Sequence, residues 1–218
     1  MYPQAGKKIE LVLGQLFDKI ITNQRGGYCY ELNYLFHSLL NQVGFDNHLI
    51  SARIFDDGKY GPEHDHMSII VNLNDLWLVD VGFGDLFIEP IKIKADVQQE
   101  DQFKFYKIVE INADEYILYE SLKINTDFKV KYKFNSRPKA ITDFDEQNMF
   151  KQTSKESYFV RNRICTIPTQ NGRKTIFNNT YKVRNKGKVD LTEIKGNEEL
   201  SKLLESQFNI TMTTKKGI

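Results

Sequence analysis

The order of sequence patterns along this chain indicates an α+β fold. Apolar residues recur at helical spacing up to about residue 43, and from about Asp46 onward they fall in short runs separated by turn residues. Helices first, antiparallel strands in the middle and mixed elements last are typical of α+β proteins. At 218 residues, 40% of them hydrophobic, the chain is long enough for one large domain or two small ones.

Two helices are expected in the first part of the chain. Leu11–Ile21 carries apolar side chains at helical spacing, and a break at Arg25–Gly27 follows it. The second helix, Tyr30–Val43, has one apolar face, formed by Leu32, Leu35, Phe36, Leu39, Leu40 and Val43. Gly44 then fits the position at which a helix ends.

A β-hairpin is predicted from Met67–Leu73 and Leu76–Phe83, because the turn residues Asn72–Asp75 separate two apolar runs. The remaining predicted elements are strands over His48–Phe55, Phe103–Ile111, Glu115–Ser121, Phe128–Phe134, Tyr158–Arg163 and Thr175–Tyr181, and helices over Ile141–Lys151 and Glu198–Phe208. Cys165 lies in a strand-like run and is interpreted as a buried structural thiol.

The charge balance argues against binding to nucleic acid or to a membrane surface. Thirty Lys and Arg residues face 29 Asp and Glu residues, for a net charge of +1, and no long run has one sign. We find no signal peptide and no apolar run of bilayer-spanning length. The two cysteines are too few for a disulfide framework, so free thiols and a cytoplasmic location are expected.

Cys29 follows a glycine pair and stands at the start of the second helix. The unpaired N–H groups and the dipole at a helix start favour a thiolate, and they can also stabilise a developing oxyanion. Gly26 and Gly27 allow a sharp turn and close approach of a substrate. The alternative is a small, inert apolar residue at a helix start, and the local sequence leaves both open.

A nucleophilic thiolate needs a base and a group that orients the base. Among the four histidines, His37 lies too far along the Cys29 helix, whereas His64 and His66 enter the first strand of the predicted hairpin. Asp80 lies in the second strand among apolar neighbours, where a carboxylate is costly without a partner. His64 and His66 also suggest metal ligands, but a zinc site needs three or four, so no metal is expected.

Three motifs in this order resemble the arylamine N-acetyltransferase family. They are Arg25–Asn33 (RGGYCYELN), His66–Met67 and Trp77–Gly84 (WLVDVGFG). The resemblance implies a Cys29–His66–Asp80 triad with a thiol-protease-like core. It also implies transfer of an acetyl group from acetyl-CoA, through an acetyl-cysteine, to an arylamine, arylhydrazine or N-hydroxyarylamine.

The resemblance also implies an architecture and binding residues. Residues 1–45 are expected to form a helical segment that carries the cysteine, residues 46–140 an antiparallel β-barrel with the histidine and aspartate, and residues 141–218 an α/β lid. Phe83 and Gly84 would bind the acceptor; the alternative is that Gly82 and Gly84 only end a strand. Gly61 and Pro62, in the loop before His66, would contact CoA phosphates.

Three further residues of the first motif are given structural roles. Arg25 is expected to pair with a buried carboxylate. Glu31 and Asn33 are interpreted as helix-start and packing residues.

The chain resembles a family member shortened at its N-terminus. Missing early helices would leave apolar surface uncovered on the first two helices, and self-association through that surface is one expected consequence. Two alternatives to the acetyltransferase remain open at this point. One is a catalytically inactive homologue that acts in binding only, and the other is a different Cys-His-Asp thiol enzyme, similar to a transglutaminase or a peptidase.

Overall fold

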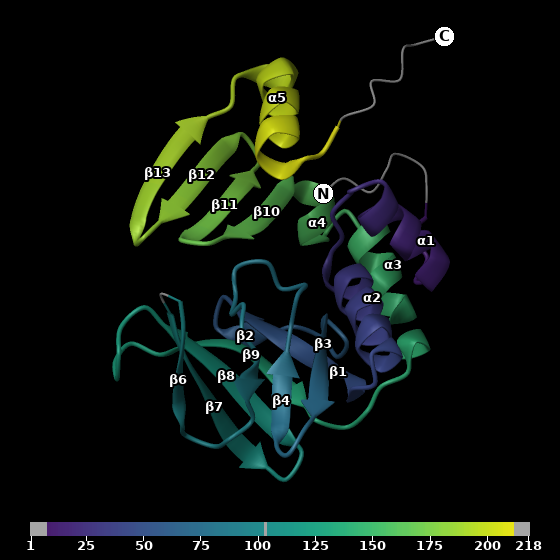
Figure 1. Cartoon of the computed structure of the whole chain (residues 1–218), viewed down its shortest axis with the longest axis vertical. Helices are drawn as coiled ribbons and strands as arrows, with labels where there is room; N and C mark the ends of the chain where they lie inside the picture. The colour runs from purple at the N-terminus through teal and green to yellow at the C-terminus, as the bar shows by residue number, and fades with distance from the viewer. Residues whose placement is uncertain (1–7, 103, 212–218) are drawn as a thin grey trace.

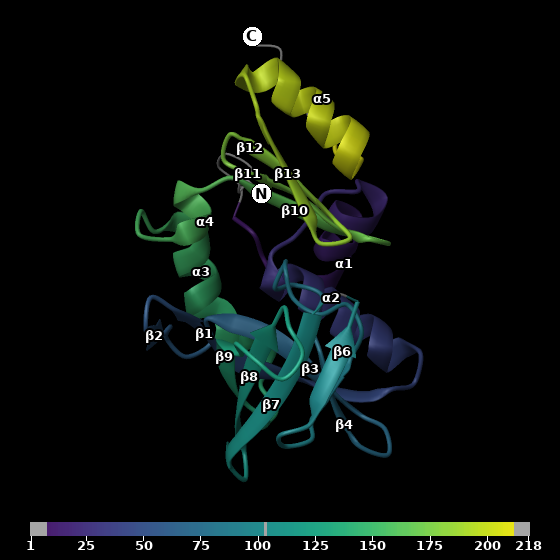
Figure 2. The ribbon, with the colours of Figure 1, turned by 90° about the vertical axis from the view of Figure 1, so that its left-hand side faces the viewer.

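The computed structural model describes residues 8–102 and 104–211. Figures 1 and 2 show a curled sheet at one end of the molecule, a smaller sheet with α5 at the other end, and the remaining helices beside them. This arrangement confirms the predicted α+β class. The division into residues 1–45, 46–140 and 141–218 stays a prediction. Within the described residues, no helix is long and apolar enough to cross a membrane.

The larger sheet is antiparallel, in the order β5-β4-β3-β1-β9-β8-β7-β6, with β2 paired to β1. Its strands are β1 (Asp46–Asp56), β2 (Lys59–Tyr60), β3 (His66–Asn72), β4 (Leu76–Val79), β5 (Ile91–Lys92), β6 (Gln98–Asp101), β7 (Lys104–Asn112), β8 (Glu115–Ser121) and β9 (Lys129–Asn135). The Gln99 side chain on the last strand bonds both the backbone N–H and the carbonyl of Lys92, so the two edges nearly close a barrel.

Successive side chains of a strand point to opposite faces of the sheet, and this alternation gives two separate apolar layers. Ile50, Ala52 and Ile70 point into the barrel, while Leu49 and Ile69 point outward against the helix α2. The outer layer is what fixes α2 on the barrel wall, because burying a helix face and a sheet face against each other removes apolar area from water.

Most predicted elements of the first two thirds of the chain are confirmed. The helices are α1 (Leu13–Phe17), which continues into the π-helix η1 (Asp18–Thr22), α2 (Cys29–Gln42), and the 3₁₀ turn η2 (Ile141–Phe144) that leads into α3 (Asp145–Thr153). Gly44, at φ +90°, follows α2 as expected. The hairpin β3–β4 pairs Asn72 with Leu76. Phe103, the first residue of one predicted strand, lies outside the described residues.

The second strand of the hairpin is shorter than predicted. It ends at Val79 rather than Phe83, because the Asp80 carboxylate accepts hydrogen bonds from the backbone N–H groups of Gly82 (2.9 Å) and Phe83 (3.0 Å). Such a side-chain turn competes with strand pairing. The consequence is a loop after β4 in place of the last strand residues.

The C-terminal part differs most from the sequence-based expectation. The predicted strand Tyr158–Arg163 is instead the short helix α4 (Tyr158–Arg161), whose start is capped by the Ser157 hydroxyl accepting from the Phe159 N–H. The predicted strand Thr175–Tyr181 is a hairpin, because the chain turns at Asn178 (φ +51°) and pairs Phe177 with Thr180.

The smaller sheet packs against α5 (Gly196–Phe208). Its strands, in chain order, are β10 (Ile164–Thr169), β11 (Gly172–Phe177), β12 (Thr180–Asn185) and β13 (Lys188–Glu193). Figure 1 shows β10 and β11 on the side that faces the barrel. The sheet is therefore placed beside the loops that leave the barrel.

Candidate active site

Cys29 is the first residue of α2 and is buried. The helix start is held by Glu31, whose carboxylate accepts from the Tyr28 N–H at 3.2 Å and binds the Lys19 ammonium at 2.5 Å. Burial raises the pKa of Glu31, and the Lys19 cation opposes that effect. Glu31 is thus the helix-start residue that the sequence predicted.

Arg25 does not take the predicted role. The buried carboxylate near it, Glu31, pairs with Lys19 from η1, and the Arg25 guanidinium donates instead to the Thr211 carbonyl at 3.1 Å. The sequence-based expectation was wrong because two cations flank the motif, and only the fold decides which one reaches the carboxylate.

The structure brings Cys29, His66 and Asp80 together. Nε2 of His66 lies 2.6 Å from Oδ2 of Asp80, and both side chains are almost fully buried. The Cys29 side chain also interacts with the imidazole, both by charge and by a hydrogen bond. A thiol, an imidazole and a carboxylate therefore form one hydrogen-bonded chain across the junction of α2 and the barrel.

Burial and charge have opposite effects on the pKa values of His66 and Asp80. Burial alone lowers the pKa of His66, but the negative charges of Asp80 and Cys29 outweigh it and raise that pKa to about 10. Burial alone raises the pKa of Asp80, but the interaction with His66 and the donated hydrogen bonds hold it below its ordinary value. At neutral pH the favoured state is therefore an imidazolium at His66 paired with a carboxylate at Asp80.

Asn33 belongs to the site, which the sequence analysis missed. Its Nδ2 donates to Asp80 (3.0 Å) and to the Met67 carbonyl (2.6 Å), and its Oδ1 accepts from the Val81 N–H (2.9 Å). Asn33 therefore ties the cysteine helix to β3 and to the loop after β4, in addition to packing. A signal was present: Asn33 stands four residues after Cys29, on the same helix face.

Gly82 is required by the close approach of the loop after β4 to α2. A Cβ atom built on it would lie 2.6 Å from Cα of Cys29 and 2.8 Å from Nδ2 of Asn33. No side chain fits in that space. The glycine therefore does more than end a strand, since it lets the loop touch the residue that carries the thiol.

Phe83 lies directly beside His66, at 5.2 Å between ring centroids and almost perpendicular. Tyr132 on β9, fully buried, is 5.7 Å from Phe83 and 5.6 Å from His66. No sequence pattern pointed to Tyr132, because only closure of the barrel brings that strand to the site. Gly84, at φ +98°, follows and faces Thr166 on β10.

The two residues before His66, His64 and Asp65, are held by contacts from Tyr30, Lys151 and Phe144. The Tyr30 hydroxyl lies 2.7 Å from the His64 carbonyl and 3.1 Å from the Asp65 carbonyl. The Asp65 carboxylate binds the Lys151 ammonium of α3 at 2.7 Å. The His64 ring packs on Phe144. Among the described residues, no group of three or more His, Cys, Asp or Glu side chains is arranged to hold a metal ion.

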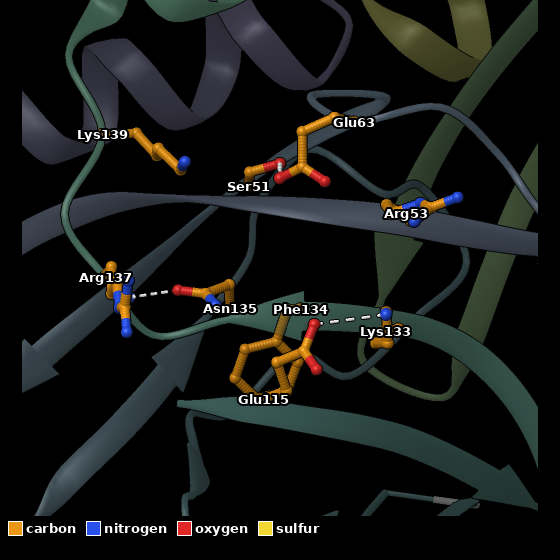
Figure 3. Close-up of a pocket in the computed structure, with 9 residues that line it drawn as sticks. All are labelled: Ser51, Arg53, Glu63, Glu115, Lys133, Phe134, Asn135, Arg137 and Lys139. Atoms are coloured by element: carbon orange, nitrogen blue, oxygen red, sulfur yellow. Dashed lines mark hydrogen bonds and ion pairs between the residues drawn. The ribbon is translucent and has the colours of Figure 1, made fainter. Parts of the chain in front are cut away.

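Gly61 and Pro62 lie in the loop that joins β2 to β3. The Gly61 N–H donates to Ile54, and its carbonyl accepts from Nε of Arg53 at 2.7 Å. Beside this loop is a cavity of about 160 Å³, lined by Ser51, Arg53, Glu63, Glu115, Lys133, Phe134, Asn135, Arg137 and Lys139 (Figure 3).

In Figure 3 the Lys133 ammonium is paired with Glu115, and the Lys139 side chain extends toward Ser51 and Glu63. Four cationic and two anionic side chains line the cavity. Its lining does not include Cys29, His66 or Asp80.

Comparisons with known proteins agree with one another. Residues 1–217 match the sequence model of the family described as N-acetyltransferase. The chain is 30% identical to the arylamine N-acetyltransferase pineal gland isozyme NAT-3 of Gallus gallus, over 96% of this chain and 81% of that protein.

Solved structures give the same fold. An arylamine N-acetyltransferase from Salmonella typhimurium has a TM-score of 0.88 at 23% identity, covering 98% of this chain and 79% of that one. The Mycobacterium marinum arylamine N-acetyltransferase in complex with CoA has a TM-score of 0.86 at 21% identity, covering 95% and 79%.

Proposed function

The chain belongs to the arylamine N-acetyltransferase family of acyltransferases, and from that membership we propose that it moves an acetyl group from acetyl-CoA to an aromatic amine through an acetyl-Cys29 intermediate. One observation carries the proposal for the site: the hydrogen-bonded chain from Cys29 through His66 to Asp80, with 2.6 Å between Nε2 and Oδ2. This chain supplies a nucleophile, a proton carrier and an orienting carboxylate.

In the first half-reaction the Cys29 thiolate attacks the thioester carbonyl of acetyl-CoA. A carbon–sulfur bond forms to Cys29, the bond to the CoA sulfur breaks, and CoA leaves as a thiolate that the His66 imidazolium can protonate. We expect N–H groups at the start of α2 to stabilise the oxyanion that develops on the carbonyl. Asp80 keeps the imidazole in one orientation throughout.

In the second half-reaction the amine nitrogen attacks the acetyl-cysteine carbonyl. His66, neutral after the first step, accepts the proton that the amine loses, and the Cys29 thiolate leaves. The N-acetylated amine is released and the imidazolium–thiolate pair is restored. Arylamine, arylhydrazine and N-hydroxyarylamine acceptors all fit this step, because each offers a nitrogen nucleophile attached directly or nearly so to a flat aromatic ring.

Phe83 and Gly84 are the proposed acceptor-binding residues. The Phe83 ring adjoins His66, so an aromatic acceptor that packs on it brings its nitrogen near the base. Gly61 and Pro62 are the proposed contacts to CoA phosphates. What supports the second assignment is the adjacent cavity of Figure 3, in which cationic side chains outnumber anionic ones.

Self-association and location are also proposals. Val12, Phe17 and Ile21 on the first helical segment and Leu39 on α2 are each about half exposed, so we propose that a second copy covers this surface. A mass by sedimentation that stays monomeric up to millimolar concentration would contradict it. A cytoplasmic location is supported by two free cysteines, which a reducing compartment preserves.

The experiment that tests the function is intact-protein mass spectrometry after brief exposure to acetyl-CoA, with Cys29→Ser as the control. We expect a single acetyl adduct that the control lacks and that an aromatic amine removes. No adduct on a folded protein would favour an inactive homologue. Thiol-dependent cleavage of peptides without CoA would favour a peptidase-like enzyme.

A further inference from the structure

We propose that Asp85 is a positioning residue for the acceptor half-reaction, because cations from the barrel and from the C-terminal sheet hold it and thereby fix Phe83 beside His66. The inference rests on the proposed function, since it concerns the acceptor loop. That loop runs from Asp80, held by His66 and Asn33, to Asp85, five residues further on. Phe83 lies between these two attachments.

Three cations from two parts of the molecule meet at the Asp85 carboxylate. Arg184 on β12 binds it in a bidentate manner, at 2.7 Å and 2.9 Å. Nε of Arg173 on β11 lies 3.4 Å away. The Lys104 ammonium on β7 lies 3.0 Å from the carboxylate and 3.1 Å from the Asp85 carbonyl. The barrel and the C-terminal sheet are thus joined through one loop residue.

The three cations Lys104, Arg173 and Arg184, with Asp85 at their centre, form a cluster that depends on the negative charge of Asp85. The Lys104 and Arg173 side chains are buried, at 8% and 7% exposure, and a buried cation without a counter-charge is strongly unfavourable. Burial raises the pKa of Asp85, but the Arg184 and Lys104 cations outweigh it, and the pKa lies far below its usual range. The carboxylate is therefore ionised at neutral pH.

A second branch of the same cluster reaches Phe83 directly. The Lys104 ammonium also binds Glu120 on β8 at 2.8 Å, and Glu120 lies 3.6 Å from the Lys131 ammonium on β9. That ammonium stands 5.4 Å above the centroid of the Phe83 ring. A cation on a ring face is attractive, so the Phe83 ring is held from the barrel side, and its loop is attached separately at Asp85.

The C-terminal sheet also contacts this loop through an uncharged side chain, Thr166. A Cβ built on Gly84 would lie 3.5 Å from the Thr166 methyl group on β10. The Thr166 hydroxyl accepts from Arg173 at 3.1 Å. Arg173 therefore connects the strand that faces Gly84 with the carboxylate that follows it, and the loop cannot shift without breaking this contact.

The contacts that hold Cys29 and Asp80 differ from those that hold Asp85. A change at Asp85 can therefore affect one half-reaction and not the other. Cys29 is held by the start of α2, and Asp80 by Asn33 and by the N–H groups of Gly82 and Phe83. Within the described part of the chain, the ion-pair partners of Asp85 are Lys104, Arg173 and Arg184, and not His66. Loss of the Asp85 charge is therefore expected to leave acetylation of Cys29 intact and to displace the aromatic side chain that the amine packs on.

The test uses the full chain and follows each half-reaction separately by intact-protein mass spectrometry. Acetyl-CoA is added first, and aniline is then added to the acetylated protein. The variants are Asp85→Asn and Asp85→Glu. The control is Asp75→Asn, because Asp75 is similarly exposed, stands on another barrel loop and also pairs with a lysine, Lys92.

We expect Asp85→Asn to acetylate within about twofold of the parent rate and to transfer the acetyl group to aniline at least about tenfold more slowly, since a displacement of about 1 Å can cost a hundredfold. Asp85→Glu should recover much of the loss and Asp75→Asn should show none. Equal transfer in Asp85→Asn and parent overturns the inference, and so does an equal slowing of both half-reactions.

Two further outcomes are informative. A parent protein that forms no adduct overturns the proposed function and this inference with it, whereas a normal adduct with unchanged transfer in Asp85→Asn overturns the inference alone. If Asp85→Asn fails to fold, Arg184→Gln takes its place, because it removes the bidentate partner from the C-terminal sheet and leaves the loop sequence intact.

Discussion

Gly82 lies where the loop after β4 packs closely against the start of α2. We expect Gly82→Ala to destabilise the protein by roughly 1–3 kcal/mol, because the added Cβ meets the Cys29 backbone at 2.6 Å and the loop or the helix must move. Urea unfolding measures this change.

The matched control is Gly14→Ala, since a Cβ there meets nothing within 4 Å. Alanine also favours the helix over glycine, so this variant should be neutral or slightly stabilising. Equal stability of the two variants would show that the loop does not approach Cys29 as closely as described.

The protonation of His66 gives a prediction about pH. Its pKa is raised to about 10, so the charged imidazolium is fully present at and below neutral pH and is lost only as the pH rises through about 10. The proposed ion pair between this imidazolium and Cys29 predicts that the rate at which iodoacetamide alkylates Cys29 is nearly constant from pH 7 to pH 9.

His66→Ala removes the cation, so we expect alkylation of Cys29 at pH 7 to slow by roughly tenfold and to rise steadily with pH. Cys165 is the internal reference, because burial raises the pKa of that thiol to about 11 and it should react slowly in both proteins. A parent rate that rises across the same range like that of the variant would contradict the ion pair.

At the scale of elements, the start of α2 depends on the pair between Lys19 of η1 and the fully buried Glu31. Replacing one partner of a buried pair leaves the other charge uncompensated. We expect Lys19→Met to cost about 3 kcal/mol in the free energy of unfolding, measured by chemical denaturation.

The control for this change is Lys202→Met, which breaks an exposed pair with Glu198 on α5 at 2.8 Å. Exposed pairs contribute little, about 0.5 kcal/mol or less. A similar cost for both variants would mean that Glu31 reaches water or becomes protonated when Lys19 is absent.

The elements also show how far sequence patterns reach. The spacing of Leu32 to Val43 predicted α2 almost to the residue, because an amphipathic face against a sheet has a fixed period. The aromatic and branched residues of Tyr158–Arg163 suggested a strand, but Phe159 packs against Tyr28 and Lys151 there, and tertiary contacts prevail over β propensity.

At the scale of the whole molecule, we expect the two sheets to differ in the protection of their backbone amides from hydrogen exchange. β1 and β3 lie inside the barrel sheet, with five of eleven residues buried in β1 and six of seven in β3, whereas β13 is an edge strand with all of its residues exposed. Local opening is easiest where little apolar area is buried. We expect amide hydrogen exchange to be slowest in β1 and β3 and fastest, among the strands, in β13.

Hydrogen–deuterium exchange with mass spectrometry measures this order without any substitution. If β13 were protected as strongly as the barrel strands, a further surface would have to cover it in solution. Protection that increased in β13 alone with protein concentration would locate the contact between copies at this edge rather than at the first helices.

The sequence by itself determined the helix of the cysteine and the central hairpin, and its motifs singled out Cys29, His66 and Asp80 as the candidate catalytic residues. These features are local, since periodicity, turn residues and a nine-residue motif fix them without distant contacts. The tertiary structure alone decided that Lys19 and not Arg25 pairs with Glu31, that Tyr132 adjoins His66, and that Arg184 holds Asp85. Each of these contacts joins residues whose approach depends on barrel closure or on the packing of separate elements, and residue spacing along a chain carries no information about such distances.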